Sequence, residues 1–169
     1  AQPKVLSWNS KQEFDKGQRN SMCFEHAGAA GGMMDILGYP YCRGRLMTHI
    51  EEDHGQYDTV QAIFWATGAC LLTRTQVYEE LGGLDAKFFA HQEEIDLCWR
   101  MLNHAQCTDN VPILVAIPQA VVYHLGGGTL GYESPRKTFL NFRNNLLMLY
   151  KNLPTTHRWW IMWVRFGMD

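Results

Sequence analysis

The chain has 169 residues, 46% of them hydrophobic, and a formal net charge of −2 at pH 7. This length suits one domain, or a piece of a larger protein, and allows a sizeable core. The basic residues are scattered and form no stripe, so nothing in the charge favours a nucleic-acid partner. No two cysteines form a CxxC pair, so we expect buried, reduced thiols rather than a zinc site or disulfide framework at Cys23, Cys42, Cys70, Cys98 and Cys107.

The first part of the chain predicts short strands and loops. Residues 3–8 are typical of a strand, and the polar residues 11–26 of a loop or hairpin. The small-residue segment AGAAGG at 27–32 matches neither GxGxxG nor a phosphate-binding loop, so we interpret it as a tight turn. The acidic segment 48–60 has the residue types that bind a cation, although a solvated loop is the simpler interpretation.

The middle of the chain is more apolar. Two buried strands, AIFWA at 62–66 and ACLL at 69–72, are expected around a glycine. A helix is predicted over 73–83, with Thr73 and Gln76 at capping-box spacing and a double glycine at its end.

Two further helices are predicted by periodicity. One covers 93–105, and its core face is Ile95, Cys98, Trp99 and Leu102. Two strands, 111–118 and 120–125, are expected on either side of Pro118. A long helix follows over 136–154, with apolar residues recurring at Phe139, Phe142, Leu146, Leu149 and Leu153. This mixture of strands and helices predicts an α/β fold.

Three carboxylates crowd the start of the helix at 93. Glu93, Glu94 and Asp96 benefit there from the positive end of the helix dipole, and Asp96 stands four residues before Arg100, which predicts a structural ion pair. Glu93 and Glu94 point in different directions, because a helix turns about 100° per residue. We therefore expect at least one of them at the edge of a pocket, with a raised pKa suited to a general base.

Two other positions have the character of ligand-binding residues. His124 ends a predicted strand before a glycine run, a place where histidine can ligate a metal or meet a diphosphate, although a solvent-facing or core-bonded histidine is commoner. Gly68 and Ala69 follow an aromatic-rich segment and offer close backbone approach to a ligand.

The segments WATGACLLTR, GGLDAKFFAHQEEIDLCWR, VVYHLGGGT and SPRKTFLNFRNNLLMLYKNLP together resemble the C-terminal half of family 2 glycosyltransferases. The rhamnosyltransferase-like branch looks most similar, and the resemblance is strongest over residues 60–154. It implies the GT-A fold, a mixed sheet flanked by helices, without the N-terminal nucleotide-binding half. It also implies an inverting transfer of a sugar from a nucleotide-sugar donor to a hydroxyl acceptor, with Mg²⁺ or Mn²⁺ at the leaving diphosphate.

The resemblance assigns roles to particular residues. The family's Glu-Asp-x-Asp motif falls on residues 93–96, so the base position is Glu94, where aspartate is commoner. Glu93 and Asp96 would orient the base or the acceptor. His124 matches a metal or diphosphate ligand of some members.

Four more positions belong to the implied pocket. Gly68 and Ala69 match the segment that lines the sugar and acceptor site. Trp65 and His91 are assigned to the acceptor side by their position alone.

The family's Asp-x-Asp metal motif is absent from this sequence. We therefore expect residues 1–154 to be the acceptor-side part of a glycosyltransferase domain cut from a larger enzyme, and inactive alone. The absence of an initiator methionine and of a leader pattern in AQPKVLSW agrees with this expectation.

Residues 155–169, rich in tryptophan, predict the start of a truncated helix that is either membrane-proximal or packed on another segment. The implied setting is the cytoplasmic face of a bacterial membrane, where many relatives build cell-surface glycans on glycan or lipid-linked acceptors.

Two alternatives remain open on sequence grounds. A non-catalytic carbohydrate- or partner-binding domain would use the aromatic residues Trp65, Phe88 and Phe89. A metal-dependent hydrolase would use Glu93, Glu94 and His124, and would cleave a simple glycoside without a nucleotide donor.

Overall fold

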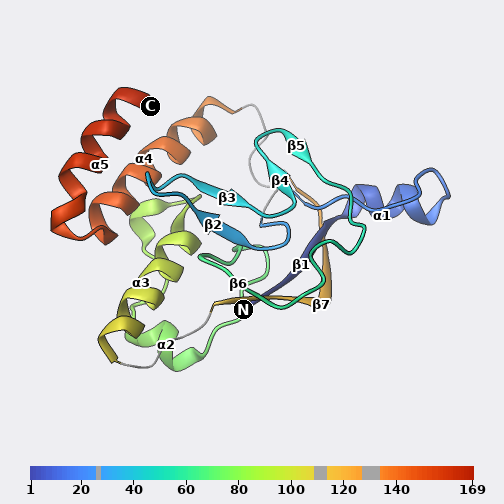
Figure 1. The fold of residues 1–169 in the computed structure, drawn as a ribbon, viewed down its shortest axis with the longest axis horizontal. Helices are drawn as coiled ribbons and strands as arrows, with labels where there is room; N and C mark the ends of the chain where they lie inside the picture. The colour runs from blue at the N-terminus through green and yellow to red at the C-terminus, as the bar shows by residue number, and fades with distance from the viewer. Residues whose placement is uncertain (26–27, 109–113, 127–133) are drawn as a thin grey trace.

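A computed structural model describes residues 1–25, 28–108, 114–126 and 134–169. These residues form a mixed α/β structure with five α-helices and two small sheets (Figure 1). The helices are α1 Trp8–Asp15, α2 Thr75–Glu80, α3 Glu93–Thr108, α4 Pro135–Asn152 and α5 Thr155–Met168, with a short 3-10 helix, η1, at Ala86–Phe88. The predicted α/β class is confirmed at this level.

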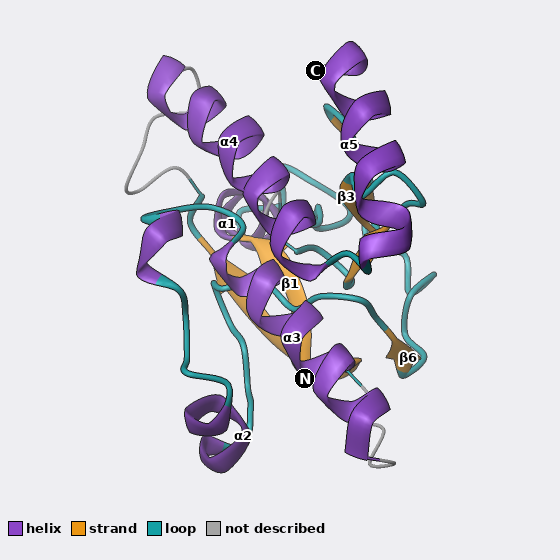
Figure 2. Ribbon diagram, turned by 90° about the vertical axis from the view of Figure 1, so that its left-hand side faces the viewer, coloured by secondary structure: helices purple, strands orange, loops and turns teal. Residues whose placement is uncertain are grey.

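The three-stranded sheet has the order β1-β7-β6. β1 (Gln2–Ser7) is parallel to the long β7 (Val115–His124), and β6 (Gln61–Ala62) is antiparallel to β7. The second sheet is an antiparallel meander of short strands in the order β2 (Gly32–Met34), β3 (Pro40–Cys42), β4 (Arg45–Leu46) and β5 (His49–Ile50). Helices α3, α4 and α5 gather on one side of the molecule, while α1 projects on the other (Figure 1). Figure 2 looks onto α3 and α4 with β1 behind them.

Two predictions about the segments at residues 11–26 and around Pro118 are wrong. Part of the expected loop at 11–26 belongs to α1, which begins after Ser7 because its hydroxyl oxygen caps the helix by accepting the N–H of Ser10. The two strands expected around Pro118 are the single strand β7. The pairing of β7 with β1 shifts register between Pro3 and Lys4 of β1. This irregularity accommodates Pro118 of β7, which has no backbone N–H to donate to the ladder.

The strands expected at 62–66 and 69–72 are also wrong, because only Gln61–Ala62 is a strand there. The backbone N–H of Thr67 is bonded to the Gln2 side chain, and that of Cys70 to the carbonyl of Thr67. Side chains and turns thus satisfy the groups that a ladder would use. The predicted capping box of Thr73 and Gln76 is wrong as well, since α2 begins at Thr75 and no side chain caps it.

Helices α3 and α4 confirm the predicted periodic segments, but among the predicted apolar positions of α4 only Leu149 is fully buried. Phe139 and Phe142 are exposed. The buried positions are Leu140, Asn144, Asn145, Met148, Leu149 and Asn152. The three asparagines donate to partners on other segments or in α4 itself, which explains why polar residues occupy the inner face.

Among the side chains described, Cys23, Cys42, Cys70 and Cys98 are free thiols, as predicted, but the predicted burial is confirmed only for Cys42 and Cys98, because Cys23 and Cys70 are half-buried. Burial raises the pKa of Cys42 and of Cys98 to about 11, so both are unreactive thiols. The side chain of Cys107 lies outside the described residues.

Gly38 shows how tightly the turn between β2 and β3 packs on α4. Its φ is +81°, and an added Cβ would lie 2.1 Å from Cδ2 of the fully buried Leu149. We expect Gly38→Ala to lower the free energy of unfolding by about 2 kcal/mol, from backbone strain plus overpacking. The matched control is Gly82→Ala, where φ is +75° and no atom lies within 4 Å, so strain alone should cost about 1 kcal/mol. Urea denaturation compares the two, and equal losses would refute the overpacking contribution.

Candidate active site

Glu94 lies in the first turn of α3, where its side chain packs over the backbone of Gly68. A Cβ built on Gly68 would lie 3.7 Å from both Cβ and Cδ of Glu94. Gly68 and Ala69 are exposed, so this side of the carboxyl group borders solvent. The Oε2 atom of Glu94 is nevertheless shielded from water and has no hydrogen-bond partner. A buried oxygen without a partner carries an energetic cost that a ligand hydroxyl group would remove.

The pKa of Glu94 is raised to about 7. Burial of the carboxyl group is the main cause, and the neighbouring charge of Glu93 adds to it. The backbone N–H groups of Glu94, Gly68 and Ile95 act in the opposite direction. A carboxyl group with a pKa near neutrality is suited to accept a proton during a reaction, so the predicted general-base chemistry has a physical basis at Glu94.

This pKa has a consequence for stability. The folded protein holds the proton of Glu94 more tightly than the unfolded chain, where the pKa is 4.5. Below pH 4.5 the carboxyl group is protonated in both states and costs no stability. Above about pH 7 it is ionised in both states, and the full free-energy cost of burying its charge applies. We expect the free energy of unfolding to fall between these values by on the order of 3 kcal/mol. Urea denaturation at pH 5 and pH 8 should show this fall in the wild type and in the control Glu79→Gln, an exposed glutamate. An undiminished fall in Glu94→Gln would contradict the assignment.

The residues just before and at the helix start share an unusual property. His91 Nε2, Gln92 Oε1, Glu93 Oε2 and Glu94 Oε2 are all buried without a hydrogen-bond partner. Four such atoms on consecutive residues exceed what a folded chain normally tolerates. Burial and the charge of Lys137 lower the pKa of His91, which favours the neutral imidazole. The arrangement fits a polar ligand with several hydroxyl groups.

The backbone that presents these side chains is strained and clamped. Phe89, His91 and Gln92 have φ values of 64°, 71° and 73°, which non-glycine residues rarely adopt. Asn144 of α4, fully buried, holds this segment by donating its Nδ2 to the carbonyl oxygens of Phe88, Ala90 and His91 at 2.7–2.9 Å. Strain of this kind persists only where surrounding contacts enforce it, and it concentrates at functional sites.

Asp96 does not join Glu93 and Glu94. It is fully buried, and its Oδ2 lies 2.8 Å from Arg100 Nε and 2.9 Å from Lys151 Nζ. Asn152 donates to its Oδ1 at 2.8 Å. The predicted ion pair with Arg100 is confirmed, and the carboxylate fastens α3 to α4. Its geometry supports a structural role.

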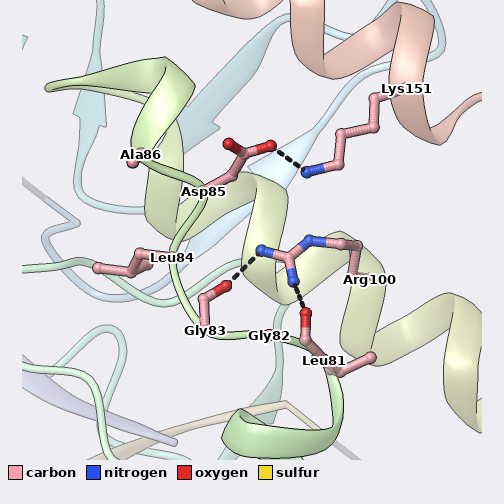
Figure 3. A pocket seen from close by; sticks show the side chains of 8 residues that line it. All are labelled: Leu81, Gly82, Gly83, Leu84, Asp85, Ala86, Arg100 and Lys151. Atoms are coloured by element: carbon pink, nitrogen blue, oxygen red, sulfur yellow. Dashed lines mark hydrogen bonds and ion pairs between the residues drawn. The ribbon is translucent and has the colours of Figure 1, made fainter.

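A hollow of about 350 Å³ lies beside the two cations that contact Asp96, and it is lined by residues 81–86, Arg100 and Lys151 (Figure 3). Arg100 donates to the carbonyl oxygens of Leu81 and Gly83 at 2.6 and 2.7 Å, and Lys151 contacts Asp85 at 2.9 Å. The cations therefore hold the segment after α2 against α3 and α4. None of the hollow's lining residues is among the candidate site residues.

The aromatic residues assigned to ligand binding are mostly covered. Trp65 is 6% exposed, packs against Gly32 and donates its indole N–H to Met33 O at 2.9 Å. Phe88 is fully buried, whereas Phe89 is 67% exposed under the guanidinium of Arg136. Core packing thus explains the presence of Trp65 and Phe88. This weakens the alternative interpretation that the chain is a carbohydrate-binding domain whose aromatic side chains stack on sugars.

His124 ends β7 opposite Ser7 of β1. Its Nδ1 is buried without a hydrogen-bond partner and lies 4.0 Å from Glu25 Oε1. Among the described residues, no group of three or more histidine, cysteine, aspartate or glutamate side chains is placed to hold a metal ion. His124 and Glu25 are therefore two possible ligands, and a complete metal site would need more. The glycines at 127 and 128 lie outside the described residues.

Comparison with known proteins gives distant, partial similarity to glycosyltransferases. The chain is 29% identical over 97 residues, 55% of its length and 29% of the relative's, to the low-salt glycan biosynthesis hexosyltransferase Agl10 of Haloferax volcanii. It is 30% identical over 67 residues, 40% of its length and 22% of the relative's, to the N-acetylglucosaminyl-diphospho-decaprenol L-rhamnosyltransferase of Mycobacterium tuberculosis. The matched segments thus span less than a third of these relatives. No family model and no solved structure matches the chain.

Proposed function

We propose that this chain is the acceptor-side part of an inverting glycosyltransferase, with Glu94 as the general base. The observation that carries the proposal is the carboxyl group of Glu94, whose pKa is about 7 and whose Oε2 is shielded and unpartnered beside the exposed Gly68. The distant similarity to a hexosyltransferase and a rhamnosyltransferase supports the same reaction class.

In this reaction the ionised Glu94 accepts the proton of an acceptor hydroxyl group. The acceptor oxygen forms a bond to the anomeric carbon of the donor sugar. The bond from that carbon to the nucleoside diphosphate breaks on the opposite face, and the electron pair leaves with the diphosphate. One base suffices, because the leaving group needs charge neutralisation rather than a proton.

The unpartnered side-chain atoms of His91, Gln92 and Glu93 would bind further hydroxyl groups of the acceptor. Gly68 and Ala69 supply an open backbone edge on the other side of Glu94. The clamp from Asn144 keeps this arrangement in place before the acceptor arrives, which limits the entropy lost on binding.

A bound Mg²⁺ or Mn²⁺ would neutralise the departing diphosphate. His124 is the candidate on this chain to hold the metal or the diphosphate, because its Nδ1 is buried and unpartnered, and the nearby carboxylate of Glu25 could be a ligand of the metal. Further ligands, and the nucleotide site, would come from parts of the protein outside this chain. A glycan or lipid-linked acceptor is in keeping with the names of the relatives, of which one is a hexosyltransferase of glycan biosynthesis and the other names a sugar-diphospho-decaprenol.

The direct test is release of nucleoside diphosphate by the full natural protein that contains this chain. The assay offers a panel of nucleotide sugars with Mn²⁺, and with glycan and polyprenyl-diphosphate-linked acceptors. We expect turnover that depends on both a donor and an acceptor, and none from the 169-residue chain alone. Turnover by the isolated chain would refute the proposal that it is only part of a glycosyltransferase domain. Hydrolysis of a simple glycoside without a donor would favour the hydrolase.

A further inference from the structure

Helix α5 is held to the body of the protein by one face. Ile161 and Arg165 on that face are 4% and 1% exposed. Arg165 donates to Leu37 O at 3.0 Å, contacts Asp169 at 2.9 Å and stacks on the ring of Tyr39 at 3.6 Å. These contacts fix the rotation of the helix about its own axis, so the residues on its opposite face point away from the protein.

That opposite face is aromatic. Trp159, Trp163 and Phe166 recur at four and three residues, a spacing that aligns side chains on one side of a helix. They are 62%, 75% and 82% exposed, and the adjacent Trp160 is 46% exposed. We call Trp159, Trp160, Trp163 and Phe166 the aromatic face. Large aromatic side chains gathered in this way on a fixed helix indicate a binding surface.

The two helices α4 and α5 together carry an excess of positive charge. Residues 134–168, which comprise α4 and α5, contain six arginines and lysines and no aspartate or glutamate. Two of these cations, Lys151 and Arg165, are paired with carboxylates. In the described part of the chain the contacts of Arg136, Arg143 and Arg158 are with aromatic rings and with carbonyl or amide oxygens, which leave the positive charge uncancelled.

We propose that the aromatic face docks α5 in the plane of an anionic lipid bilayer. Tryptophan and phenylalanine insert at the level of the headgroups, and Arg158, which directly precedes Trp159 in α5, contacts lipid phosphates. None of the helices described has the length and apolar character needed to cross a bilayer, so α5 would lie on the surface. The excess of arginine and lysine over carboxylates in residues 134–169, six against one, favours an anionic lipid surface over a protein partner. This inference goes beyond the proposed transfer reaction and does not depend on it.

Vesicle flotation of the full natural protein that contains this chain tests the proposal. The vesicles are phosphatidylcholine alone, or phosphatidylcholine mixed with phosphatidylglycerol. We expect binding to the anionic vesicles that weakens as salt is added. The double variant Trp159→Ser, Trp163→Ser should raise the half-saturating lipid concentration by about 10-fold or more, because less apolar surface is inserted. The matched control is Phe14→Ser on α1, also an exposed aromatic residue, and it should bind like the wild type.

Circular dichroism checks that the double variant is folded. A second measurement needs no variant: brominated lipids in the anionic vesicles should quench the tryptophan fluorescence of the wild type. Absence of quenching, or equal binding by wild type and double variant, overturns the proposal. A dimer that the double variant abolishes, together with no vesicle binding, also overturns it and assigns the aromatic face to a second copy of the chain.

Discussion

Glu94→Gln is expected to lower the turnover number of the full natural protein by about 100-fold or more. Glutamine has nearly the shape of glutamate and keeps the packing over Gly68, but it cannot accept the acceptor's proton. Nucleoside diphosphate release measures the loss, and an unchanged melting temperature or a higher one shows that folding is intact. Retention of full activity would refute Glu94 as the base and direct attention to Glu93.

The pH dependence of the same reaction separates the base from its neighbour. Because the base acts when ionised, the wild-type rate should rise through a midpoint near pH 7 and then level off. The charge of Glu93 contributes to the raised pKa of Glu94, so Glu93→Gln should move the midpoint to lower pH while retaining most of the maximal rate. A midpoint that does not move in Glu93→Gln would show that the two carboxyl groups are not coupled.

Periodic helical segments were predictable, and segments whose backbone is satisfied by distant side chains were not. Helices α3 and α4 follow from their apolar spacing. The apolar segment from 62 to 72 has the composition of strands, yet Gln2, far away in sequence, bonds the backbone of Thr67. No local pattern encodes such a contact.

The candidate site shows the same division. Its carboxylates were identified from sequence, and so was the ion pair of Asp96 with Arg100. The clamp from Asn144 was missed, although two adjacent asparagines within a long helix were a visible signal that polar groups face inward. The positive φ values of His91 and Gln92 could not be predicted, because α4 imposes them from more than fifty residues away.

Asp96→Ala is expected to lower the free energy of unfolding by about 4 kcal/mol. Asp96 is fully buried, and its removal deprives Arg100, Lys151 and Asn152 of a shared acceptor. The cost is large because Asn152 is buried and Arg100 is mostly covered, so neither is fully rehydrated when the carboxylate is removed. Urea denaturation of the chain measures it, and the isosteric Asp96→Asn should fall between the wild type and Asp96→Ala, since it keeps the volume but loses the charge.

Asp85→Ala is the matched control, because both carboxylates lie 2.9 Å from the same atom, Nζ of Lys151. The side chain of Asp85 is 25% exposed, whereas that of Asp96 is fully buried, so Asp85→Ala should cost only about 1 kcal/mol. Similar losses in the two variants would refute burial as the source of the effect.

An Asp96→Asn variant that stays folded at the assay temperature but loses turnover as fully as Glu94→Gln would place Asp96 in the reaction rather than in the scaffold. The contacts argue for the scaffold, because Asp96 already has three partners, whereas Glu94 leaves one oxygen free for an acceptor.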